Sequence, residues 1–342
     1  MRKLLNTLYV TTEDSYLFCE NETIAVKIGG EVKVRLPAHT IETVVCFGNT
    51  TVSTPLIAFC GERGIGLIFL SKYGRFYGRV NGPVSGNVLL RKRQYEASED
   101  REFVVPFIKG LISCKLINSR NMLLRSSREH PDRKAAEDLK SAATQLGKMG
   151  EQLLMADCPD TIRGIEGVAA SIYFSRFDKM LKTKYDELRF DVRSRHPPQN
   201  PVNAVLSFLY VLLASDIQSA LETVGLDPAV GFLHAIRPGR PSLALDLMEE
   251  LRAPFCDRLA LALFNRGQLT PEDFEYNTGV CTISGKARRL IISSYQTRKK
   301  ETIIHPFLKE EIEIGLIPHV QAKLLARVLR GDLDRYPPFV WR

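Results

Sequence analysis

The chain has 342 residues of ordinary globular composition, 44% hydrophobic and 25% charged, with 47 Lys and Arg against 39 Asp and Glu. This length predicts two domains, and the net charge of +8 favours a polyanionic partner, nucleic acid before membrane. The sequence shows no secretory signal and no apolar run of about 18–20 residues, and its seven cysteines are scattered without a C-x-x-C pair. Together these features argue against disulfide-rich, zinc-ribbon and membrane-spanning classes and predict a cytoplasmic protein with no membrane partner.

Residues 1–95 are predicted to form a β-rich domain. Short alternating or apolar runs of strand length are separated by glycines and prolines, and they lie at residues 23–28, 32–36, 43–47 and 66–70, with a hairpin expected over 71–80. One helix is expected over 54–63. This part holds 12 Lys and Arg against 7 Asp and Glu, so it is the more basic of the two parts and suits a contact surface.

The rest of the chain is predicted to be helical. Residues 96–105 begin with the polar run EASEDRE and are interpreted as a linker, and 106–342 as a C-terminal α-helical catalytic domain. Apolar residues recur with a period near 3.6 over seven segments: 107–125, 134–154, 161–182, 202–222, 242–263, 284–299 and 317–331. The predicted fold class is therefore α+β, with a small N-terminal β-rich domain followed by a larger all-α catalytic domain.

Two glycine motifs resemble nucleotide-binding loops without matching them. Residues 61–66 read G-x-x-G-x-G, the reverse of the dinucleotide fingerprint, and they run into a strand instead of a helix. Between Gly279 and Gly285 lie five residues where a P-loop needs four, and Ala287 follows Lys286 where Ser or Thr would bind magnesium. Hydride transfer and P-loop hydrolysis are therefore disfavoured.

A carboxylate lies on the packed side of one predicted helix. In the segment 161–174, Glu166 follows Ile162 by four residues and precedes Ala169 by three, which directs it toward the apolar face. A carboxylate buried there needs a cation nearby, because an unpaired buried charge is costly. That cation is either an arginine in a structural ion pair or a metal ion.

A second group of polar residues follows about seventy residues later. His234 precedes a Pro/Gly loop, and Asp246 and Glu249 stand at i and i+3 on one helical face. Taken singly, a histidine before a loop usually makes only a local hydrogen bond, and an acidic helix edge is usually solvated surface. Taken with Glu166, they form a mixed imidazole and carboxylate set that suits Mg²⁺ or Mn²⁺, ions that assist phosphodiester chemistry.

At these residues the sequence resembles the CRISPR-associated adaptation integrase (Cas-one) family, in particular its subtype I-C branch. The resemblance runs along nearly the whole chain and is carried by six stretches: LLNTLYVT at 4–11, GNVLLR at 86–91, EG at 166–167, the segment 197–204, GFLH at 231–234 and LDLME at 245–249. One departure is Gln199-Asn200, where the family pattern has a basic residue and Asp before the proline. Asn caps a helix about as well as Asp.

The resemblance implies a β domain joined to an α-helical catalytic domain, and a homodimer formed largely through the β domain. It implies that Glu166, His234 and Glu249 ligate Mg²⁺ or Mn²⁺ and that Asp246 is an auxiliary catalytic acid or supports the ligands. With a small ferredoxin-like second CRISPR adaptation protein, such dimers join short duplex DNA fragments into a CRISPR array. The 3′-hydroxyl of the fragment attacks a phosphodiester at a repeat boundary, without ATP.

Two other functions remain open, namely a non-catalytic DNA-binding scaffold and a general metal-dependent nuclease. Seven basic residues are predicted to contact DNA: Lys72, Arg75 and Arg79 on the 71–80 hairpin, Arg237 and Arg240 beside the acids, and Arg288 and Arg289 near a helix start. The alternatives are that Phe76 and Tyr77 of the hairpin fill the β core, and that Arg237 and Arg240 pair with Asp246 and Glu250.

Overall fold

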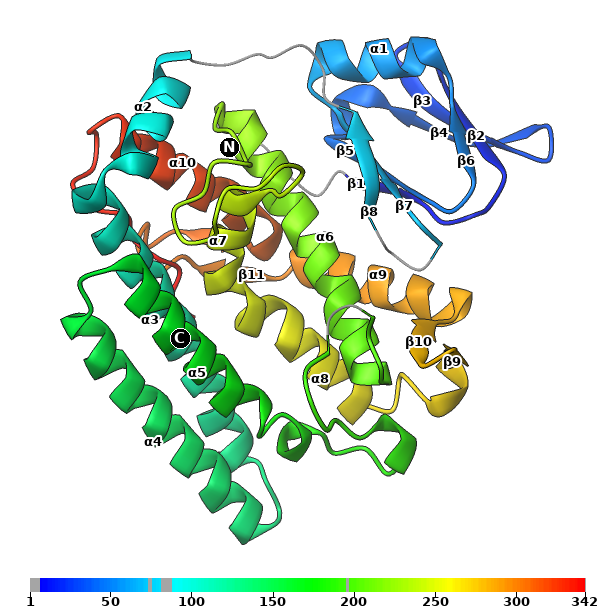
Figure 1. Cartoon of the computed structure of the whole chain (residues 1–342). Coiled ribbons are helices and arrows are strands. Elements are labelled where there is room, and N and C mark those ends of the chain that lie inside the picture. The colour runs from blue at the N-terminus through cyan, green and yellow to red at the C-terminus, as the bar shows by residue number, and fades with distance from the viewer. Residues whose placement is uncertain (1–6, 73–75, 81–87, 195–196, 342) are drawn as a thin grey trace.

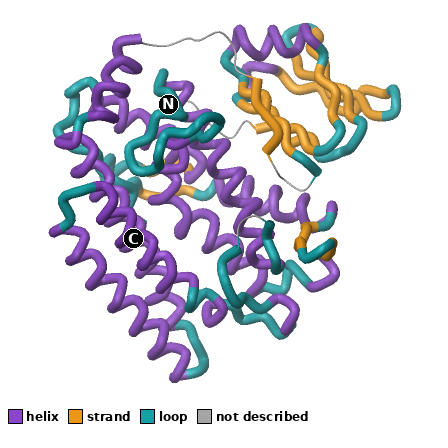
Figure 2. The backbone as a smooth tube through the Cα atoms, viewed as in Figure 1, coloured by secondary structure: helices purple, strands orange, loops and turns teal. Residues whose placement is uncertain are grey.

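The computed structural model describes residues 7–72, 76–80, 88–194 and 197–341. A strand-rich N-terminal region lies beside a larger, mostly helical C-terminal region (Figure 1). Coloured by secondary structure, the strands gather in the first region and the long helices in the second (Figure 2). The predicted α+β class, with a small β-rich part first and a larger helical part after it, is confirmed.

Two four-stranded sheets and one helix build the N-terminal region. The first sheet has the order β1-β5-β7-β8, with strands at Thr7–Val10, Thr43–Phe47, Gly66–Leu70 and Phe76–Val80. The second has the order β4-β3-β2-β6, with strands at Glu31–Pro37, Thr23–Ile28, Ser15–Glu20 and Thr50–Val52. Strands β1, β5 and β7 are parallel, and helix α1 (Thr54–Arg63) makes the crossover from β6 to β7.

Strand β5 is buried on both faces, which explains its uninterrupted apolar sequence. Val44 and Cys46 belong to the core between the two sheets, whereas Val45 and Phe47 belong to the core shared with the helices. Successive side chains of a strand point to opposite faces, so a strand covered on both sides has apolar residues at every position. The Phe47 ring lies 6.0 Å from that of Phe208, which joins the two regions.

Nine helices are described in the C-terminal region. They are α2 (Val88–Glu99), α3 (Arg101–Arg128), α4 (Arg133–Met155), α5 (Pro159–Phe174), α6 (Pro201–Val224), α7 (Ser242–Leu251), α8 (Arg258–Asn265), α9 (Gly285–Lys299) and α10 (Ile317–Leu329). A π-helical turn, Arg252–Asp257, joins α7 to α8. Each of the seven periodic segments of the sequence overlaps at least one of these helices.

The prediction that the C-terminal region is all-α needs one correction. It also contains two small antiparallel sheets, which pair β9 (Phe274–Asn277) with β10 (Val280–Ile283) and β11 (Thr302–Ile304) with β12 (Glu311–Glu313). These strands have only three or four residues, too short to stand out from the helical periodicity around them.

The linker prediction is wrong, because residues 96–105 lie in helices α2 and α3. The two helices meet at Asp100, whose carboxylate accepts a hydrogen bond of 2.9 Å from the backbone N–H of Glu102 and caps α3. Polar helix formers give an exposed helix and a linker the same composition, which is why composition misled here. Residues 81–87, between β8 and α2, lie outside the described residues.

Helix α6 is the central helix of the molecule and lies between the strand-rich region and the other helices (Figure 1). By length and composition it alone among the described helices is apolar enough to cross a membrane, although polar residues interrupt it, and 56% of its most apolar window is buried within the fold. The burial of α6 in the core accounts for its high hydropathy.

Asn200 caps α6 by accepting a 2.8 Å hydrogen bond from the N–H of Asn203. Asn therefore serves as the helix cap at the position where this sequence departs from the family pattern.

Candidate active site

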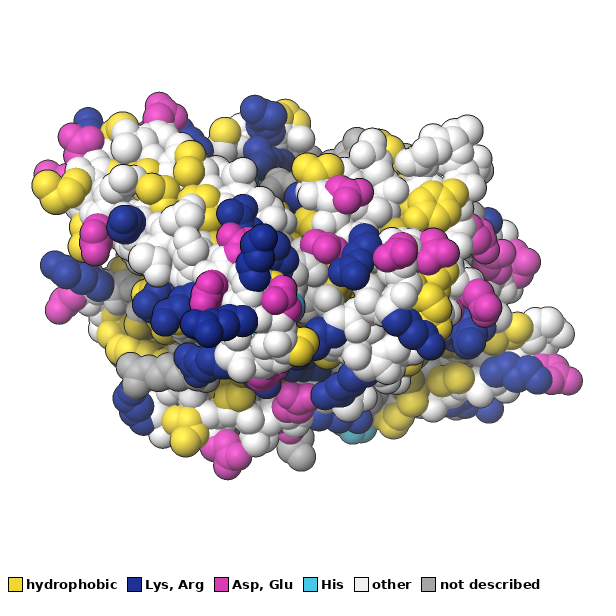
Figure 3. All heavy atoms as spheres, turned by 90° about the horizontal axis from the view of Figure 1, so that it is seen from below, with side chains coloured by type: hydrophobic (Ala, Val, Ile, Leu, Met, Phe, Trp, Pro, Cys, Tyr) yellow, Lys and Arg dark blue, Asp and Glu magenta, His cyan; other side chains and the backbone are white. Residues whose placement is uncertain are grey.

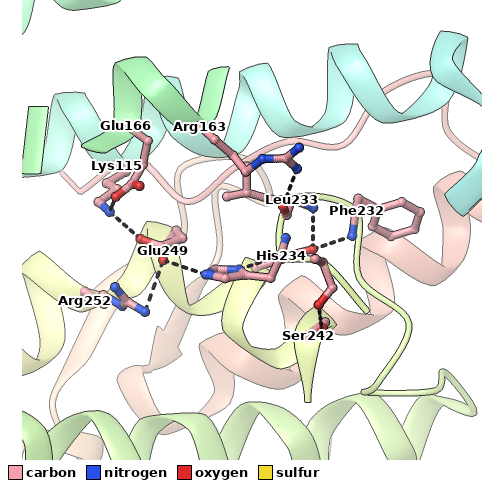
Figure 4. A network of polar contacts seen from close by, with 11 residues as sticks. Lys115, Arg163, Glu166, Phe232, Leu233, His234, Ser242, Glu249 and Arg252 are labelled. Carbon is pink, nitrogen blue, oxygen red and sulfur yellow. Dashed lines mark hydrogen bonds and ion pairs between the residues drawn. The ribbon is translucent and has the colours of Figure 1, made fainter. Parts of the chain in front are cut away.

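Polar side chains from four separate segments meet beside α7 (Figure 4). The residues are Lys115 from α3, Glu166 from α5, His234 from the loop between α6 and α7, and Asp246 and Glu249 from α7 itself. Helix α3 packs against both α5 and α7. The packing of these helices therefore brings residues that follow Lys115 by 51 to 134 positions in the sequence next to its side chain.

Asp246 fixes the loop that carries His234. Its carboxylate is fully buried and accepts three backbone hydrogen bonds, from the N–H groups of Phe232 (2.6 Å), Leu233 (3.0 Å) and His234 (2.9 Å). It also lies 2.7 Å from Nδ1 of the His234 ring. Because an ionised carboxylate only accepts, Nδ1 carries a proton, and Nε2 faces Glu249 Oε1 at 3.8 Å.

The loop approaches α7 so closely that it requires a glycine. A Cβ on Gly231 would lie 2.7 Å from the backbone carbon of Ser242 and 2.8 Å from Asp246 Oδ2. Ser242 donates from Oγ to the carbonyl of Ala235 at 3.0 Å, and Arg163 of α5 donates to the carbonyl of Leu233 at 3.0 Å. The loop backbone on either side of His234 is therefore held by α5 and α7.

The cation beside Glu166 is a lysine, which the sequence analysis did not identify. The Lys115 ammonium forms ion pairs with Glu166 Oε1 and, at 2.6 Å, with Glu249 Oε2. Arg252 Nη2 lies 3.1 Å from Glu249 Oε1. Burial acts to raise the pKa of Glu249, but the charges of Arg252 and Lys115 outweigh it and hold this pKa well below its ordinary value.

One oxygen of this group has a charged neighbour but no well-aligned hydrogen bond. Glu249 Oε2 is buried, and within the described ranges no group reaches it with hydrogen-bond geometry, although the Lys115 ammonium is close. A cavity of about 20 Å³, lined among others by Lys115, Glu249 and Arg252, has room for about one water molecule or small ion. Among the residues that the structure describes, no three His, Cys, Asp or Glu side chains stand close enough together to hold a metal ion as they are placed.

Glu250 points away from this group, although it is the next residue of α7. Its carboxylate accepts hydrogen bonds from Tyr336 Oη (2.6 Å), the N–H of Phe339 (2.6 Å) and Gln321 Nε2 (3.1 Å). Burial raises the pKa of Glu250 to about 7. The alternative that Arg237 or Arg240 pairs with Asp246 or Glu250 is wrong, because both acids are buried and bonded to other groups.

Two of the predicted DNA contacts are buried inside the protein. Arg79 has a side chain that is 7% exposed and forms an ion pair with Glu222 of α6, and Arg288 is 8% exposed in the core of α9. Both side chains lie too deep in the fold for the predicted DNA-facing role, and Arg79 connects β8 to α6. The stem of an arginine often packs inside a protein, and a sequence motif does not reveal this.

The other basic candidates lie on the surface or outside the described residues. Lys72, Arg237 and Arg289 are exposed, Arg240 is half-buried, and Arg75 lies outside the described residues. Tyr77 of β8 is 66% exposed, which rules out the alternative that it fills the β core. The side chain of Phe76 lies outside the description.

Lys115 and Arg252 were missed for different reasons. Lys115 lies four residues after buried Leu111 and seven before buried Met122, so a lysine on the buried stripe of α3 was a signal that it has an acidic partner. Arg252 follows Glu249 by three residues, the spacing of an intrahelical ion pair. Neither residue belongs to a recognisable ligand motif.

Comparison with known proteins yields consistent similarities over the whole chain. A family described as "CRISPR associated protein Cas1" matches residues 8–297. The chain is 46% identical to "CRISPR-associated endonuclease Cas1 1" of Chlorobaculum tepidum and 49% identical to "CRISPR-associated endonuclease Cas1 2" of Rhodospirillum rubrum, each over the full length of both chains.

Solved structures share the fold at lower identity. A CAS1 protein from Thermotoga maritima superposes with a TM-score of 0.83 at 22% identity, covering 95% of this chain and 97% of that one. A casposase bound to its integration product has a TM-score of 0.83 at 19% identity, covering 98% and 94%. At these identities the structures establish the fold, whereas the full-length relatives establish the similarity in sequence.

Proposed function

The chain belongs to the Cas1 family of CRISPR-associated proteins, and we propose that it joins short duplex DNA fragments into a CRISPR array. On this proposal the 3′-hydroxyl of the fragment attacks a phosphodiester at a repeat boundary, and the exchange of one ester for another needs no ATP. The observation that carries the proposal is that Glu166 and Glu249 share one cation, the Lys115 ammonium, while the His234 ring lies beside Glu249.

The donor set fits a divalent ion, Mg²⁺ or Mn²⁺. The Lys115 ammonium lies between the carboxylates of Glu166 and Glu249 as a stand-in cation, and Glu249 Oε2 is a buried acceptor without a hydrogen bond. Nε2 of His234 faces the same carboxylate, and as a neutral imidazole it would be a ligand for such an ion. When bound, such an ion polarises a phosphodiester and stabilises the leaving oxygen.

The chain's own residues have distinct roles in this proposal. Asp246 orients His234 and fixes its tautomer, and Arg252 keeps Glu249 ionised. In the metal-free chain Lys115 neutralises two carboxylates that would otherwise repel each other. Asp246 therefore acts as a positioning residue.

Arg237 and Arg240 are the best-placed candidates to hold the phosphate. They follow His234 by three and six residues on the same loop, and neither forms an ion pair within the described part of the chain. Guanidinium groups bind phosphate oxygens through paired N–H donors. Lys72 and Arg289 are exposed and would contact DNA further from the reacting end.

The partners also follow from family membership as proposals. Solved structures similar in fold include a Cas6-RT-Cas1–Cas2 complex, so we propose that this chain also works with a small second adaptation protein. A homodimer and a cytoplasmic location stay predictions of the sequence analysis.

A strand-joining assay tests the function. Purified protein with Mn²⁺, a labelled short duplex and a supercoiled plasmid bearing a repeat should yield plasmid-joined label. Nicks without joining would support a general nuclease instead, and DNA binding without either product would support a scaffold.

Substitution links the activity to the proposed residues. We expect Glu166→Gln, His234→Ala and Glu249→Gln each to lower joining by about a thousandfold or more, because each removes a group that stabilises transition-state charge. Glu137→Gln is the control, since it neutralises an exposed carboxylate on α4. Joining by all three site variants at the control's rate would refute the proposed site.

A further inference from the structure

A fully buried amide on α2 bonds to the segment that carries His234. On the face of the molecule that Figure 3 shows, Lys and Arg side chains lie among Asp and Glu side chains in several groups, so surface charge there does not single out one residue. Gln94, by contrast, has an exposed fraction of 0%. A buried amide is costly unless its N–H groups and its oxygen are bonded, so its partners show what it holds in place.

The Gln94 amide is satisfied by the backbone of one short turn. Its Nε2 donates to the carbonyls of Asp227 at 2.8 Å and Val230 at 2.9 Å, and its Oε1 accepts from the N–H of Asp227 at 2.9 Å. Because carbonyls only accept and the N–H only donates, these partners fix which way the amide is turned. A carboxylate lacks the donors, lysine and arginine lack the acceptor, and asparagine is one methylene shorter. This set of partners therefore calls for glutamine.

Tyr95, the next residue of α2, holds the same turn from another side. Its hydroxyl donates to Asp227 Oδ2 at 2.9 Å, and Asp227 Oδ1 accepts from the N–H of Ala229 at 2.8 Å. Adjacent residues of a helix point about 100° apart, so α2 contacts this turn in two directions. Helix α2 is itself anchored, since Leu90 and Ala97 are buried in the core.

The segment that carries His234 has no regular structure of its own. Residues 226–241 contain neither a helix nor a strand, so bonds to other elements hold this part of the chain. Asp246 accepts from the N–H groups of residues 232–234, at one end of the segment. Three bonds that converge on one carboxylate restrain rotation about it less than bonds at both ends of a segment do. The Gln94 amide supplies the restraint at the other end.

Three residues separate Val230 from His234, and they leave little slack. A Cβ on Gly231 would lie 2.7 Å from the backbone carbon of Ser242, so the segment already lies against α7 and cannot move closer to it. A displacement of Val230 therefore passes on to the imidazole. Because site residues must be held within about 0.5 Å of their productive geometry, a small displacement is enough to weaken the binding of an ion.

We propose that Gln94 is a positioning residue for His234, whose amide, together with the Tyr95 hydroxyl, holds the turn at 227–230 so that the imidazole faces Glu249. This inference rests on the proposed function, in which His234 and Glu249 bind a divalent ion. Gln94 acts through the backbone of the turn and not by contact with the ion.

The test compares two fully buried glutamines, each replaced by methionine, which has a similar length and no amide. Gln321 is the matched control, because it is also 0% exposed and its Nε2 bonds to Glu250 and Tyr336 instead of the turn. Gln94→Met should bind Mn²⁺ about tenfold more weakly than the unmodified chain, measured by titration, whereas Gln321→Met should stay within about threefold of it.

NMR of the His234 ring gives a second readout, which needs no metal. In protein labelled with ¹⁵N-histidine, His234→Ala identifies the ring signals, and the chemical shifts of the two nitrogens of the neutral ring report which one carries the proton. The unmodified chain and Gln321→Met should hold the proton on Nδ1, whereas Gln94→Met should show the Nε2–H form in about a fifth or more of the molecules. Tyr95→Phe removes one hydroxyl from a side chain that is 45% exposed, so it keeps the test valid if Gln94→Met fails to fold, and it should show a smaller change in the same direction.

The outcomes separate positioning from general stability. Equal Mn²⁺ affinity and equal tautomer fractions in Gln94→Met, Gln321→Met and the unmodified chain would overturn the inference. Equal losses of affinity in both methionine variants would also overturn it, because a general loss of stability would then explain them. Strand joining by the unmodified chain would show that the proposed function survives either result. A tautomer change in Gln94→Met alone, in a chain that joins no DNA, would support the positioning role and count against the proposed function.

Discussion

The two sides of helix α7 bury adjacent glutamates in opposite surroundings. Glu249 faces two cations, Lys115 and Arg252, and its pKa is held below the ordinary value. The donors to Glu250 among the described residues are neutral, from Tyr336, Gln321 and the N–H of Phe339, and burial raises the pKa of Glu250 to about 7. Burial alone therefore does not mark a functional carboxylate, whereas the charge of its neighbours does.

Asp257 belongs with Glu250 in this comparison. Its carboxylate accepts hydrogen bonds from Tyr210 (2.7 Å) and Tyr173 (3.0 Å), and burial raises its pKa to about 6. Tyrosine hydroxyls hold both of these acids in place and join α5, α6 and the C-terminal segment to the π turn and α7. Buried acids bonded to neutral donors, such as Glu250 and Asp257, stabilise the fold. A buried acid beside cations, such as Glu249, is suited to a cation site.

The largest effect on stability is expected for Glu250→Ala. It leaves the side chains of Tyr336 and Gln321 and the N–H of Phe339 without their acceptor, so we expect the free energy of unfolding to fall by about 3–5 kcal/mol. Urea denaturation measures this change. A decrease below about 1 kcal/mol would contradict the role of Glu250 as a clamp on the C-terminal segment.

Asp257 should make stability depend on pH. Because its folded-state pKa lies above the ordinary value, the native state binds the proton more tightly, and its contribution to stability falls as pH rises from about 4 to about 6. Over this range the unmodified chain should lose about 2–3 kcal/mol relative to Asp257→Asn. Denaturation of both proteins across that pH range measures the difference, and a pH-independent difference would contradict the assignment.

Asp246→Asn tests the positioning of His234. The amide accepts fewer hydrogen bonds from the loop and no longer fixes the imidazole tautomer, so affinity for Mn²⁺ should fall about 10- to 100-fold. Isothermal titration calorimetry measures the affinity. Unchanged affinity would show that His234 is not held by Asp246 in the way that metal binding requires.

Lys115→Met gives the smallest expected change. Without the ammonium, Glu166 and Glu249 repel each other, so the metal-free chain should lose about 1–2 kcal/mol of stability. The increase in melting temperature on adding Mn²⁺ should be larger than in the unmodified chain, because the amine no longer competes for the carboxylate oxygens. A smaller increase would contradict the view of Lys115 as a stand-in cation.

The sequence predicted most of the helices because their apolar periodicity is long and regular. It also predicted that Glu166 needs a cation and that Asp246 and Glu249 share a helical face. It did not identify Lys115, which lies 51 residues before Glu166 and whose partners are set by the packing of α3. The sequence pattern of a single helix does not show which residue of another helix its side chains will contact.

Burial of individual arginines was equally invisible in the sequence. The K-Y-G-R-F-Y-G-R run suggested a basic surface, but Arg79 turns inward and pairs with Glu222 of α6. Glu249 and Glu250 are adjacent in the sequence, yet adjacent residues of a helix point about 100° apart. Only the tertiary packing separates their roles.

The most direct test of the cation site is Mn²⁺ binding to three forms of the chain, measured by titration. The unmodified chain should bind Mn²⁺, Glu249→Gln should bind it at least about 100-fold more weakly, and Glu250→Gln should stay within about threefold of the unmodified affinity. Equal binding by Glu249→Gln and the unmodified chain, or the absence of binding by the folded unmodified chain, would contradict the account.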